Sequence, residues 1–382
     1  MSEPKRRLHP ETIAIHSAAK RPETGDVMPP IHLSTTFVRA PDGSYPSGFD
    51  YIRSGNPGRE ELETCLSELE IAEVAVATPS GMAATHAVFS ALDPGDRVLV
   101  PLDTYYGTKN LLHTHFERWG LEVESIDMSS PTVIERALER RTRLIWLETP
   151  SNPCITITDL GHAIAAAQRH GTLVACDNTW ATPVLQRPLE LGADIVVHST
   201  TKYIAGHSDA MGGAVLFRER SETAERVREA QTEAGLTPAP FDCWLIRRGL
   251  YTLACRMKTH CENAQRLAEF LETQDGVERV HFPGLASDPG HEVAKRQMSD
   301  FGGMLSFVVH GGRERAFDLV NSLSIARPAT SLGGPETLIE HRASIEGEGT
   351  QAPEGLLRVS VGLEHPEDLT ADFGEALAAS TA

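Results

Sequence analysis

The chain has 382 residues and a formal net charge of −18, because 53 acidic residues outnumber 35 basic ones. With 40% apolar and 23% charged residues, its composition is that of a globular protein and excludes intrinsic disorder for most of the chain. The acidic balance, without a basic stripe, argues against a nucleic-acid partner. No apolar run approaches the roughly 18 residues of a membrane span, so we expect no membrane partner either.

Residues 1–58 are rich in Pro, Gly, Ser and Thr and show little helical period, which is typical of an extended arm rather than of a domain. The basic start, Met1–Leu8, is not followed by an apolar stretch, so we expect no signal peptide. The six cysteines show no paired spacing, and several lie in apolar segments, as reduced cysteines do. These features predict a soluble protein of the reducing cytoplasm.

From about residue 59, short apolar runs alternate with segments of helical spacing. The predicted strands are Val74–Thr78, Arg97–Pro101, Glu122–Asp127, Arg143–Thr149, Thr172–Asp177, Ile195–Thr200 and Gly213–Phe217. The predicted helices are Arg59–Glu70, Gly81–Leu92, Gly107–Trp119, Thr132–Arg140 and Asp159–His170. This alternation indicates a doubly wound, mostly parallel sheet of six or seven strands with both faces covered. We expect this α/β domain to span residues 59–245.

The pattern changes near residue 242. Apolar residues at three- and four-residue steps predict one long amphipathic helix over Asp242–Glu272. Strand-like runs follow at Val277–Phe282, Gly303–Val309, Leu323–Arg327 and Leu356–Val361, with a last helix at Pro366–Ala379. We therefore expect a second, smaller α+β domain over residues 246–382, and the length agrees with two or three domains.

In proteins with an open α/β sheet, the active site lies at the carboxyl ends of the strands. Ser80, Gly81 and Met82 follow such an end and open a predicted helix. Unpaired amides at a helix start bind anions, and glycine lets the backbone come close. The alternative is an ordinary helix capped by Ser80.

Two further strand ends carry ionisable side chains. Asp177 ends one buried strand, where it either serves a ligand or opens a turn by bonding local amides. Lys202 follows another, directly after Ser199 and Thr201. Lysine ordinarily lies on a solvated face. The chain has only six lysines, and Lys202 is the one that follows a buried strand. Burial favours the neutral amine, the form that makes Schiff bases.

Together the three strand ends match the needs of pyridoxal phosphate. This cofactor requires a lysine amine for its aldehyde, a carboxylate for its ring nitrogen and an anion cradle for its phosphate. Lys202, Asp177 and the helix start at Ser80–Met82 supply these three groups. No histidine or cysteine spacing predicts a metal site, since His113 and His115 point apart on a helix.

At this point the chain resembles the Cys/Met-metabolism family of pyridoxal-phosphate enzymes, which includes cystathionine synthases and lyases, methionine γ-lyase and O-acylhomoserine sulfhydrylases. The resemblance extends from Pro29 to the last predicted helix. The matching segments are Tyr51–Pro57, Ser80–Met82, Glu148–Pro153, Asp177–Thr179, His198–Tyr203, Gly206–Asp209, Ser331–Gly334 and Leu357–Glu364. It implies the aspartate-aminotransferase-like fold, with a seven-stranded sheet and a smaller C-terminal domain.

The resemblance also implies roles for individual residues in cofactor binding. Lys202 would hold the cofactor and move protons, Asp177 would pair with the ring nitrogen, and Tyr105 would stack on the ring as a further catalytic residue. The phosphate would be held by Ser80, Gly81, Met82, Ser199 and Thr201. Tyr51 and Arg53 would reach the same phosphate from a neighbouring subunit, so the resemblance implies an obligatory dimer and commonly a homotetramer.

For the substrate, the resemblance implies that Arg358 binds the α-carboxylate, helped by Asn152 and Ser331. Relatives that handle cystathionine usually carry Glu where this chain has Thr330. The family's usual residue at the position of Tyr106 is Gly, so this chain adds an aromatic side chain near the ring. The segment His341–Gly347 also departs from the family pattern, and it gains the charges of Arg342 and Glu346. We hypothesise that Glu346 faces a distal cationic group, such as that of canavanine, with loop drift as the alternative.

The resulting hypothesis is an enzyme that performs γ-elimination or γ-replacement on a small, γ-substituted amino acid. The substrate would be derived from homoserine or would contain sulfur, for example an O-acylhomoserine or methionine. A pyridoxal-phosphate β-lyase or aminotransferase is the first alternative. A non-catalytic scaffold is the second, because a fold alone does not establish function.

Overall fold

The computed structural model describes residues 8–17, 25–347, 350 and 352–380. Its larger sheet has seven strands in the order β1-β7-β6-β5-β4-β2-β3, and only β7 runs antiparallel to its neighbours. The strands are β1 (Val74–Thr78), β2 (Arg97–Pro101), β3 (Glu122–Ile126), β4 (Leu144–Glu148), β5 (Leu173–Asp177), β6 (Ile195–His198) and β7 (Gly213–Phe217). The predicted mostly parallel seven-stranded sheet is therefore confirmed, with strand ends that differ by at most two residues.

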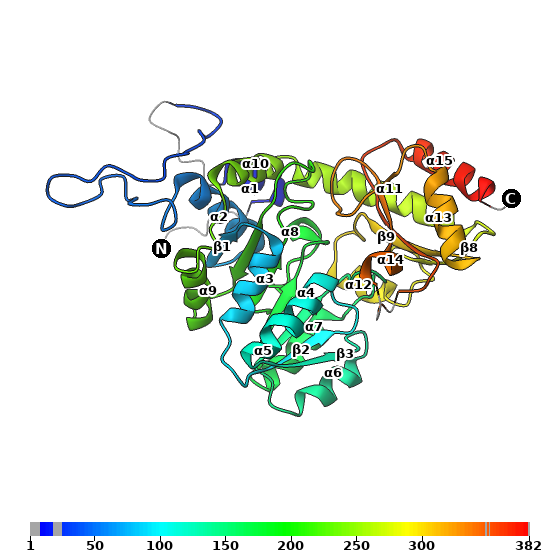
Figure 1. Cartoon of the computed structure of the whole chain (residues 1–382), viewed down its shortest axis with the longest axis horizontal. Helices are drawn as coiled ribbons and strands as arrows, with labels where there is room; N and C mark the ends of the chain where they lie inside the picture. The colour runs from blue at the N-terminus through cyan, green and yellow to red at the C-terminus, as the bar shows by residue number, and fades with distance from the viewer. Residues whose placement is uncertain (1–7, 18–24, 348–349, 351, 381–382) are drawn as a thin grey trace.

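Helices cover both faces of this sheet (Figure 1). They are α2 (Pro57–Glu70), α3 (Gly81–Ser90), α4 (Tyr106–Leu111), the π-helical turn η1 (Leu112–Phe116), α5 (Glu117–Trp119), α6 (Pro131–Leu138), α7 (Leu160–Arg169), α8 (Thr182–Leu185) and α9 (Glu222–Thr232). Side chains alternate between the two faces along each strand. In β4, Ile145 and Leu147 join the core beneath α2 and α7, whereas Leu144 and Trp146 join the core beneath α3 and α9.

The helix predicted as one unit over Asp242–Glu272 is two helices, α10 (Pro240–Leu250) and α11 (Leu253–Glu272). They are separated at Thr252, whose φ of −111° and ψ of 6° are not helical. The guanidinium of Arg256 donates to the carbonyl of Gly249 at 2.8 Å and to that of Tyr203 at 2.6 Å. The helical pattern does not predict this break, because Arg256 binds the carbonyl of Tyr203, a residue that is remote in sequence.

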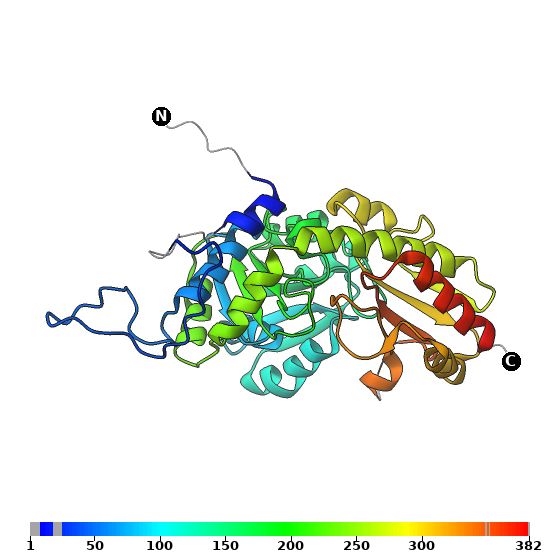
Figure 2. The same ribbon diagram turned by 90° about the horizontal axis from the view of Figure 1, so that it is seen from above.

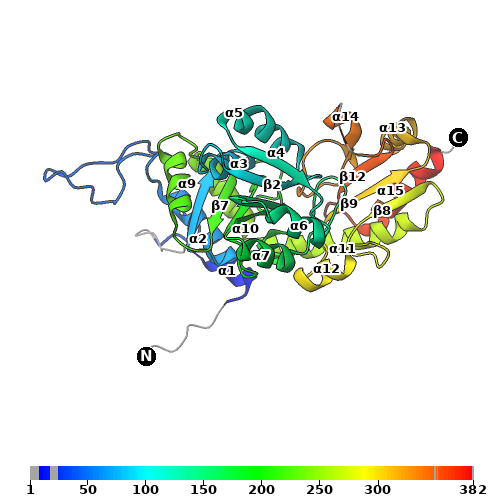
Figure 3. The ribbon, with the colours of Figure 1, turned by 90° about the horizontal axis from the view of Figure 1, so that it is seen from below.

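The second sheet has five strands in the order β10-β11-β12-β9-β8 (Figure 3). They are β8 (Val277–His281), β9 (Met304–Val309), β10 (Arg327–Pro328), β11 (Leu338–His341) and β12 (Leu356–Ser360), with helices α12 (His291–Gln297), α13 (Gly312–Ser322), α14 (Arg342–Glu346) and α15 (Pro366–Ala379). The first half of α11 packs in a core of the large sheet, and the second half packs in the core of the small sheet. This helix therefore connects the two sheets.

The strand predicted over Leu323–Arg327 was wrong. The carboxylate of Asp372 accepts hydrogen bonds from the backbone amides of Ser324, Ile325 and Ala326, so these amides cannot join a ladder. Strand β10 begins only at Arg327. The sequence pattern also missed β11 and α14, which are four and five residues long.

The N-terminal segment contains one helix that the sequence pattern missed, α1 (Pro10–His16). Arg247 fixes it by donating to the carbonyls of Ala14 and Ser17. Much of the segment 25–56 extends away from the rest of the chain (Figure 2). Its two halves are joined by a bridge between Thr36 and Tyr51 and by further hydrogen bonds, such as that from the amide of Phe37 to the carbonyl of Asp50. The expected arm is thus extended over most of its described length, while residues 1–7 and 18–24 lie outside the described residues.

Within the described residues, no helix is long and apolar enough to cross a membrane. All six cysteines are free thiols.

Candidate active site

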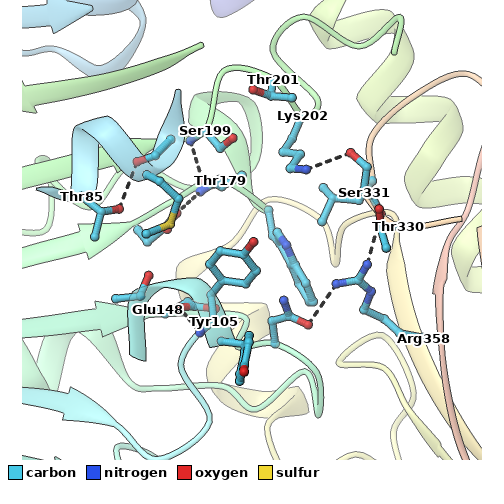
Figure 4. A pocket seen from close by; sticks show the side chains of 18 of the residues that line it. Thr85, Tyr105, Glu148, Thr179, Ser199, Thr201, Lys202, Thr330, Ser331 and Arg358 are labelled. Carbon is cyan, nitrogen blue, oxygen red and sulfur yellow. Dashed lines mark hydrogen bonds between the residues drawn. The ribbon is translucent and has the colours of Figure 1, made fainter. Parts of the chain in front are cut away.

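A cavity of about 430 Å³ lies at the carboxyl ends of β1, β4, β5 and β6. Its other wall comes from the C-terminal part of the chain, through residues 330–332, β11, α14 and β12. Figure 4 shows side chains of both parts pointing into this space. The site therefore depends on how the small sheet packs against the large one.

Lys202 projects into the cavity from the turn that follows β6. Its Nζ donates a hydrogen bond to Oγ of Ser331 at 2.8 Å (Figure 4). Burial, reinforced by the positive charge of Arg358, lowers the pKa of Lys202 to about 8. Ser331 itself has a φ of 91°, a backbone strain that is concentrated at functional sites. The geometry thus prepares an amine that can lose its proton near neutral pH.

Asp177 ends β5 and lines the same cavity. Its Oδ1 accepts from the amide of Thr179 at 3.0 Å, and the hydroxyl of Thr179 accepts from the amide of Ser199 at 2.9 Å. Burial raises the pKa of Asp177, and hydrogen bonds from Thr179 oppose that increase. A buried carboxylate of this kind is suited to a cationic ring nitrogen.

Glu70, His198 and Asn178 form a buried polar network near Asp177. His198 Nε2 lies 2.6 Å from Glu70 Oε1, and both side chains are fully buried. The amide of Asn178 also donates to Glu70, at 3.0 Å. His198 is among the groups that act to lower the pKa of Asp177.

The start of α3 has the geometry of the predicted anion cradle. Ser80 caps this helix by accepting from the amide of Ala83 at 3.1 Å, and the first amides of a helix have no intrahelical partner. A Cβ placed on Gly81 would lie 2.6 Å from Cβ of Ser199, so only glycine fits here. Met82 and Ser199 line the cavity beside it. Thr201 also lines it, although its hydroxyl already bonds the backbone of Gly212.

Tyr105 lies at the mouth of the cavity, with its ring directed inward (Figure 4). Its backbone amide donates to Oε2 of Glu148 at 2.9 Å. A Cβ on Gly107 would lie 2.5 Å from the ring, so the absence of a side chain at that position makes room for Tyr105. Tyr106 lines the cavity next to it.

Arg358 enters from β12, on the same side of the cavity as Lys202 and with Ser331 between the two (Figure 4). It donates to Oδ1 of Asn152 and to the carbonyl of Ser331, each at 3.1 Å, and forms an ion pair with Glu340. Its Nε is buried without a hydrogen-bond partner, and burial lowers the pKa of Arg358 to about 10. A guanidinium with an unused donor provides a site for a carboxylate.

Twelve of the fifteen residues that the sequence analysis selected line the cavity; the exceptions are Tyr51, Arg53 and Glu346. In this single chain Tyr51 is 46% exposed, and Arg53 donates to the carbonyl of Thr232 at 2.6 Å. Thr330 lines the cavity as expected. Glu346 instead pairs with Arg342 and accepts from Thr350.

Twelve further residues line the cavity that the sequence analysis did not select as site residues, among them Glu148, Glu340 and Trp180. Glu148 ends β4, so the strand-end rule could have found it; burial, followed by the charge of Asp177, raises its pKa well above its usual range. Glu340 could have been suspected as an acidic residue in the apolar strand β11. Trp180 follows Asp177 by three residues, but nothing in the pattern distinguishes it from a core residue.

The residues present fit pyridoxal phosphate. Lys202 offers a buried amine, Asp177 a buried carboxylate, and the start of α3 a cradle that a single Cβ at Gly81 would fill. The three groups border one cavity of about 430 Å³, which is a size typical of small-molecule sites.

Comparisons with known proteins agree with this geometry. A family model described as "Cys/Met metabolism PLP-dependent enzyme" matches residues 11–378. The cystathionine gamma-synthase of Mycobacterium tuberculosis is 44% identical over 375 residues, which cover 96% of each chain. The cystathionine beta-lyase of Coxiella burnetii is 40% identical over 382 residues, or 97% of this chain and 98% of the other. The crystal structure of metB from Corynebacterium glutamicum superposes with a TM-score of 0.94 and 42% identity, covering 97% and 98% of the two chains.

Proposed function

We propose, from the premise that this chain belongs to the Cys/Met metabolism family of pyridoxal-phosphate-dependent enzymes, that it acts at Cγ of a γ-substituted amino acid. The γ-substituent leaves and is either replaced by a nucleophile or not replaced. In the second case the substrate and one water yield the released group, 2-oxobutyrate and ammonia. The observation that carries the proposal is that Lys202 and Arg358 line one cavity, with Ser331 between them hydrogen-bonded to both.

Lys202, Asp177, Ser199 and the start of α3 would hold the cofactor. Pyridoxal phosphate, when bound, withdraws electrons from the substrate and makes its Cα and Cβ protons acidic. Lys202 then takes these protons at Nζ, because its lowered pKa leaves part of the amine neutral near pH 8. Ser331 orients that amine through the 2.8 Å hydrogen bond.

Arg358 and Asn152 would bind the substrate α-carboxylate, and their direct hydrogen bond fixes both side chains before the substrate arrives. Tyr105 would cover the cofactor ring. Glu148 accepts from the backbone of Tyr105 and from the hydroxyl of Thr104, so it holds the polypeptide that carries this ring in place.

Chemistry at Cγ needs a base for the Cβ proton as well as for the Cα proton, and we propose that Lys202, which lines the cavity beside Ser331, serves both. Thr330 lines the cavity with a short neutral side chain, so it offers no carboxylate to the distal ammonium group of cystathionine. We therefore propose O-acylhomoserines and methionine ahead of cystathionine as substrates.

Product analysis tests the proposal. The holoenzyme is incubated with O-acetylhomoserine, O-succinylhomoserine, methionine, canavanine and cystathionine, with and without cysteine. 2-Oxobutyrate with ammonia shows γ-elimination, a new thioether shows γ-replacement, and pyruvate or an amino-group transfer supports the alternatives. Borohydride reduction should bleach the yellow protein and label Lys202, with Lys202→Ala as control. A colourless protein without a label would refute every enzyme assignment.

The active unit would be a homo-oligomer, at least a dimer and commonly a tetramer, in which Tyr51 and Arg53 of one chain complete the phosphate site of the next. The exposure of Tyr51 and the apolar surface of the extended segment, for example Leu33 at 66% and Val38 at 87% exposed, support this arrangement. Six free cysteines agree with a place in the reducing cytoplasm.

A further inference from the structure

Two arginines share one buried carboxylate on the C-terminal wall of the cavity. Glu340 accepts from Nη1 of Arg342 at 2.6 Å through Oε1, and from Arg358 through Oε2. The antiparallel register of β11 and β12 places Glu340 directly opposite Arg358, and Arg342 begins α14 two residues later. All three side chains are at most 5% exposed. The two arginines therefore interact through Glu340.

Glu346 holds Arg342 from the other side. Nε and Nη2 of Arg342 donate to Oε1 of Glu346 at 3.2 and 2.8 Å, and Oε2 accepts from the hydroxyl of Thr350 at 2.6 Å. Both carboxylate oxygens of Glu346 are thus engaged within the chain. Glu346 does not line the cavity and is held by Arg342 and Thr350, so the structure gives no support to the hypothesis that it faces a distal cationic group.

Arg342 competes with Arg358 for the negative charge of Glu340. Without Arg342, the carboxylate of Glu340 would face Arg358 alone, and a buried carboxylate next to a guanidinium largely cancels its charge. With Arg342 present, Glu340 is attracted to two cations at once, and its Oε1 is occupied by Arg342. Arg358 then keeps more of its positive potential, together with its unpartnered Nε.

We propose that Arg342 is a positioning residue that acts through Glu340 and keeps the charge of Arg358 available to the α-carboxylate of the substrate. The proposal rests on the proposed function, in which Arg358 binds that carboxylate. Arg358, Glu340, Arg342 and Glu346 together carry no net charge. Loss of Arg342 alone leaves a net charge of −1 beside the place where a carboxylate must bind.

A series of charge variants tests this. Arg342→Met gives the network a net charge of −1, Arg342→Met with Glu346→Gln restores zero, and Glu346→Gln alone gives +1. Each holoenzyme is assayed for kcat and KM with O-acetylhomoserine, and for cofactor affinity. A unit charge at this depth should change KM by about tenfold. We expect KM to rise about tenfold in the first variant, to return to within about threefold of wild type in the second, and to be equal or lower in the third.

The proposal also predicts which constants do not move. The dissociation constant of the cofactor should stay within about twofold of wild type in all three variants, because Asp177 and the start of α3 are not part of the network. kcat should change less than KM, because Lys202 is affected by the network only through the charges of Arg358 and Glu340. A merely structural role for α14 predicts the opposite order, in which the double variant is impaired at least as much as the single one. That order, or an unchanged KM in Arg342→Met, would overturn the proposal.

A binding measurement separates this proposal from the proposed function. L-Norvaline has the α-carboxylate but no group that can leave from Cγ, and butylamine lacks the carboxylate. Calorimetry on the holoenzymes should show weaker binding of norvaline, but not of butylamine, in Arg342→Met. The binding measurement tests the inference even if the wild-type enzyme turns over none of the tested substrates. That result would refute the proposed function but not the role of Arg342. If Arg342→Met does not fold, Arg342→Lys should keep KM within about threefold, and a raised KM in Glu346→Gln would refute the inference.

Discussion

Replacing Gly81 by alanine would place a methyl group between the start of α3 and the end of β6. The added Cβ would lie 2.6 Å from Cβ, 2.8 Å from Oγ and 2.9 Å from Cα of Ser199. Ordinary carbon contacts begin near 3.4 Å, so the two segments must separate by several tenths of an ångström. Because backbone atoms are involved, rotation of the Ser199 side chain cannot relieve the clash.

The separation should weaken cofactor binding rather than prevent folding. In the cofactor-free protein the segments can move apart into the cavity, whereas a bound phosphate requires the amides of α3 and the hydroxyl of Ser199 together. Overpacking of this size costs about 1–3 kcal/mol. At 1.4 kcal/mol per factor of ten, the dissociation constant should rise about 5- to 150-fold.

The assay titrates cofactor-free protein with pyridoxal phosphate and follows the absorbance of the bound cofactor. Gly161→Ala is the matched control, because Gly161 also lies in the first turn of a helix but its Cβ would meet only Oδ1 of Asp159, at an ordinary 3.5 Å. Wild-type affinity in Gly81→Ala, or equal weakening in both variants, would refute the assignment of this turn as the anion cradle.

Three further outcomes follow from the site. In the cofactor-free protein, the pKa of Lys202 is about 8 in the folded state, against a usual value of 10.5. Between pH 8 and pH 10.5 the folded state therefore binds fewer protons than the unfolded state, and the stability of the fold increases as the pH rises. Lys202→Met should therefore be more stable than wild type below pH 8, and the difference should shrink between pH 8 and 10.5 in urea titrations. Glu70→Leu removes the partner of the buried His198 and should lower the free energy of unfolding by about 3–5 kcal/mol, with a smaller loss for Glu70→Gln. Mixing inactive Lys202→Ala and Arg53→Ala chains should restore about a quarter of wild-type activity, because half of the random dimers are hybrids with one intact site.

Each of these has a contradicting result. A pH-independent difference between wild type and Lys202→Met would show that the amine is not desolvated in the fold. Equal stabilities of the Leu and Gln variants at position 70 would show that the contact with His198 contributes little. No recovery on mixing chains would place Arg53 in the site of its own chain, contrary to the proposed oligomer.

Local sequence pattern alone predicted the parts of the site that are set by a single strand end, whereas Arg358, Ser331 and Thr330 were selected only through the resemblance to the family. Lys202, Asp177 and Gly81 each follow a buried strand, and parallel strands bring their carboxyl ends to one edge, so local pattern is enough to place them together. The seven-stranded sheet was predictable for the same reason.

The parts that the sequence did not predict depend on contacts between distant segments. Arg256 interrupts the helix predicted over Asp242–Glu272 by binding the carbonyls of Gly249 and Tyr203. Asp372 prevents a strand at Ser324–Ala326 by capturing three amides from 46 to 48 residues away. Glu346 carries a charge that looked available to a substrate, but its partner, Arg342, could be identified only once the fold of α14 was known.

The pairing of Glu340 with Arg358 across β11 and β12 restricts where this chain can change in length. Side chains alternate with a period of two, so one residue inserted into β11 would turn Ile339 or His341 toward the cavity and remove the carboxylate that both arginines share. Changes in chain length outside these two strands leave the pairing intact, so the carboxylate-binding arginine can stay in place while other parts of the cavity wall vary.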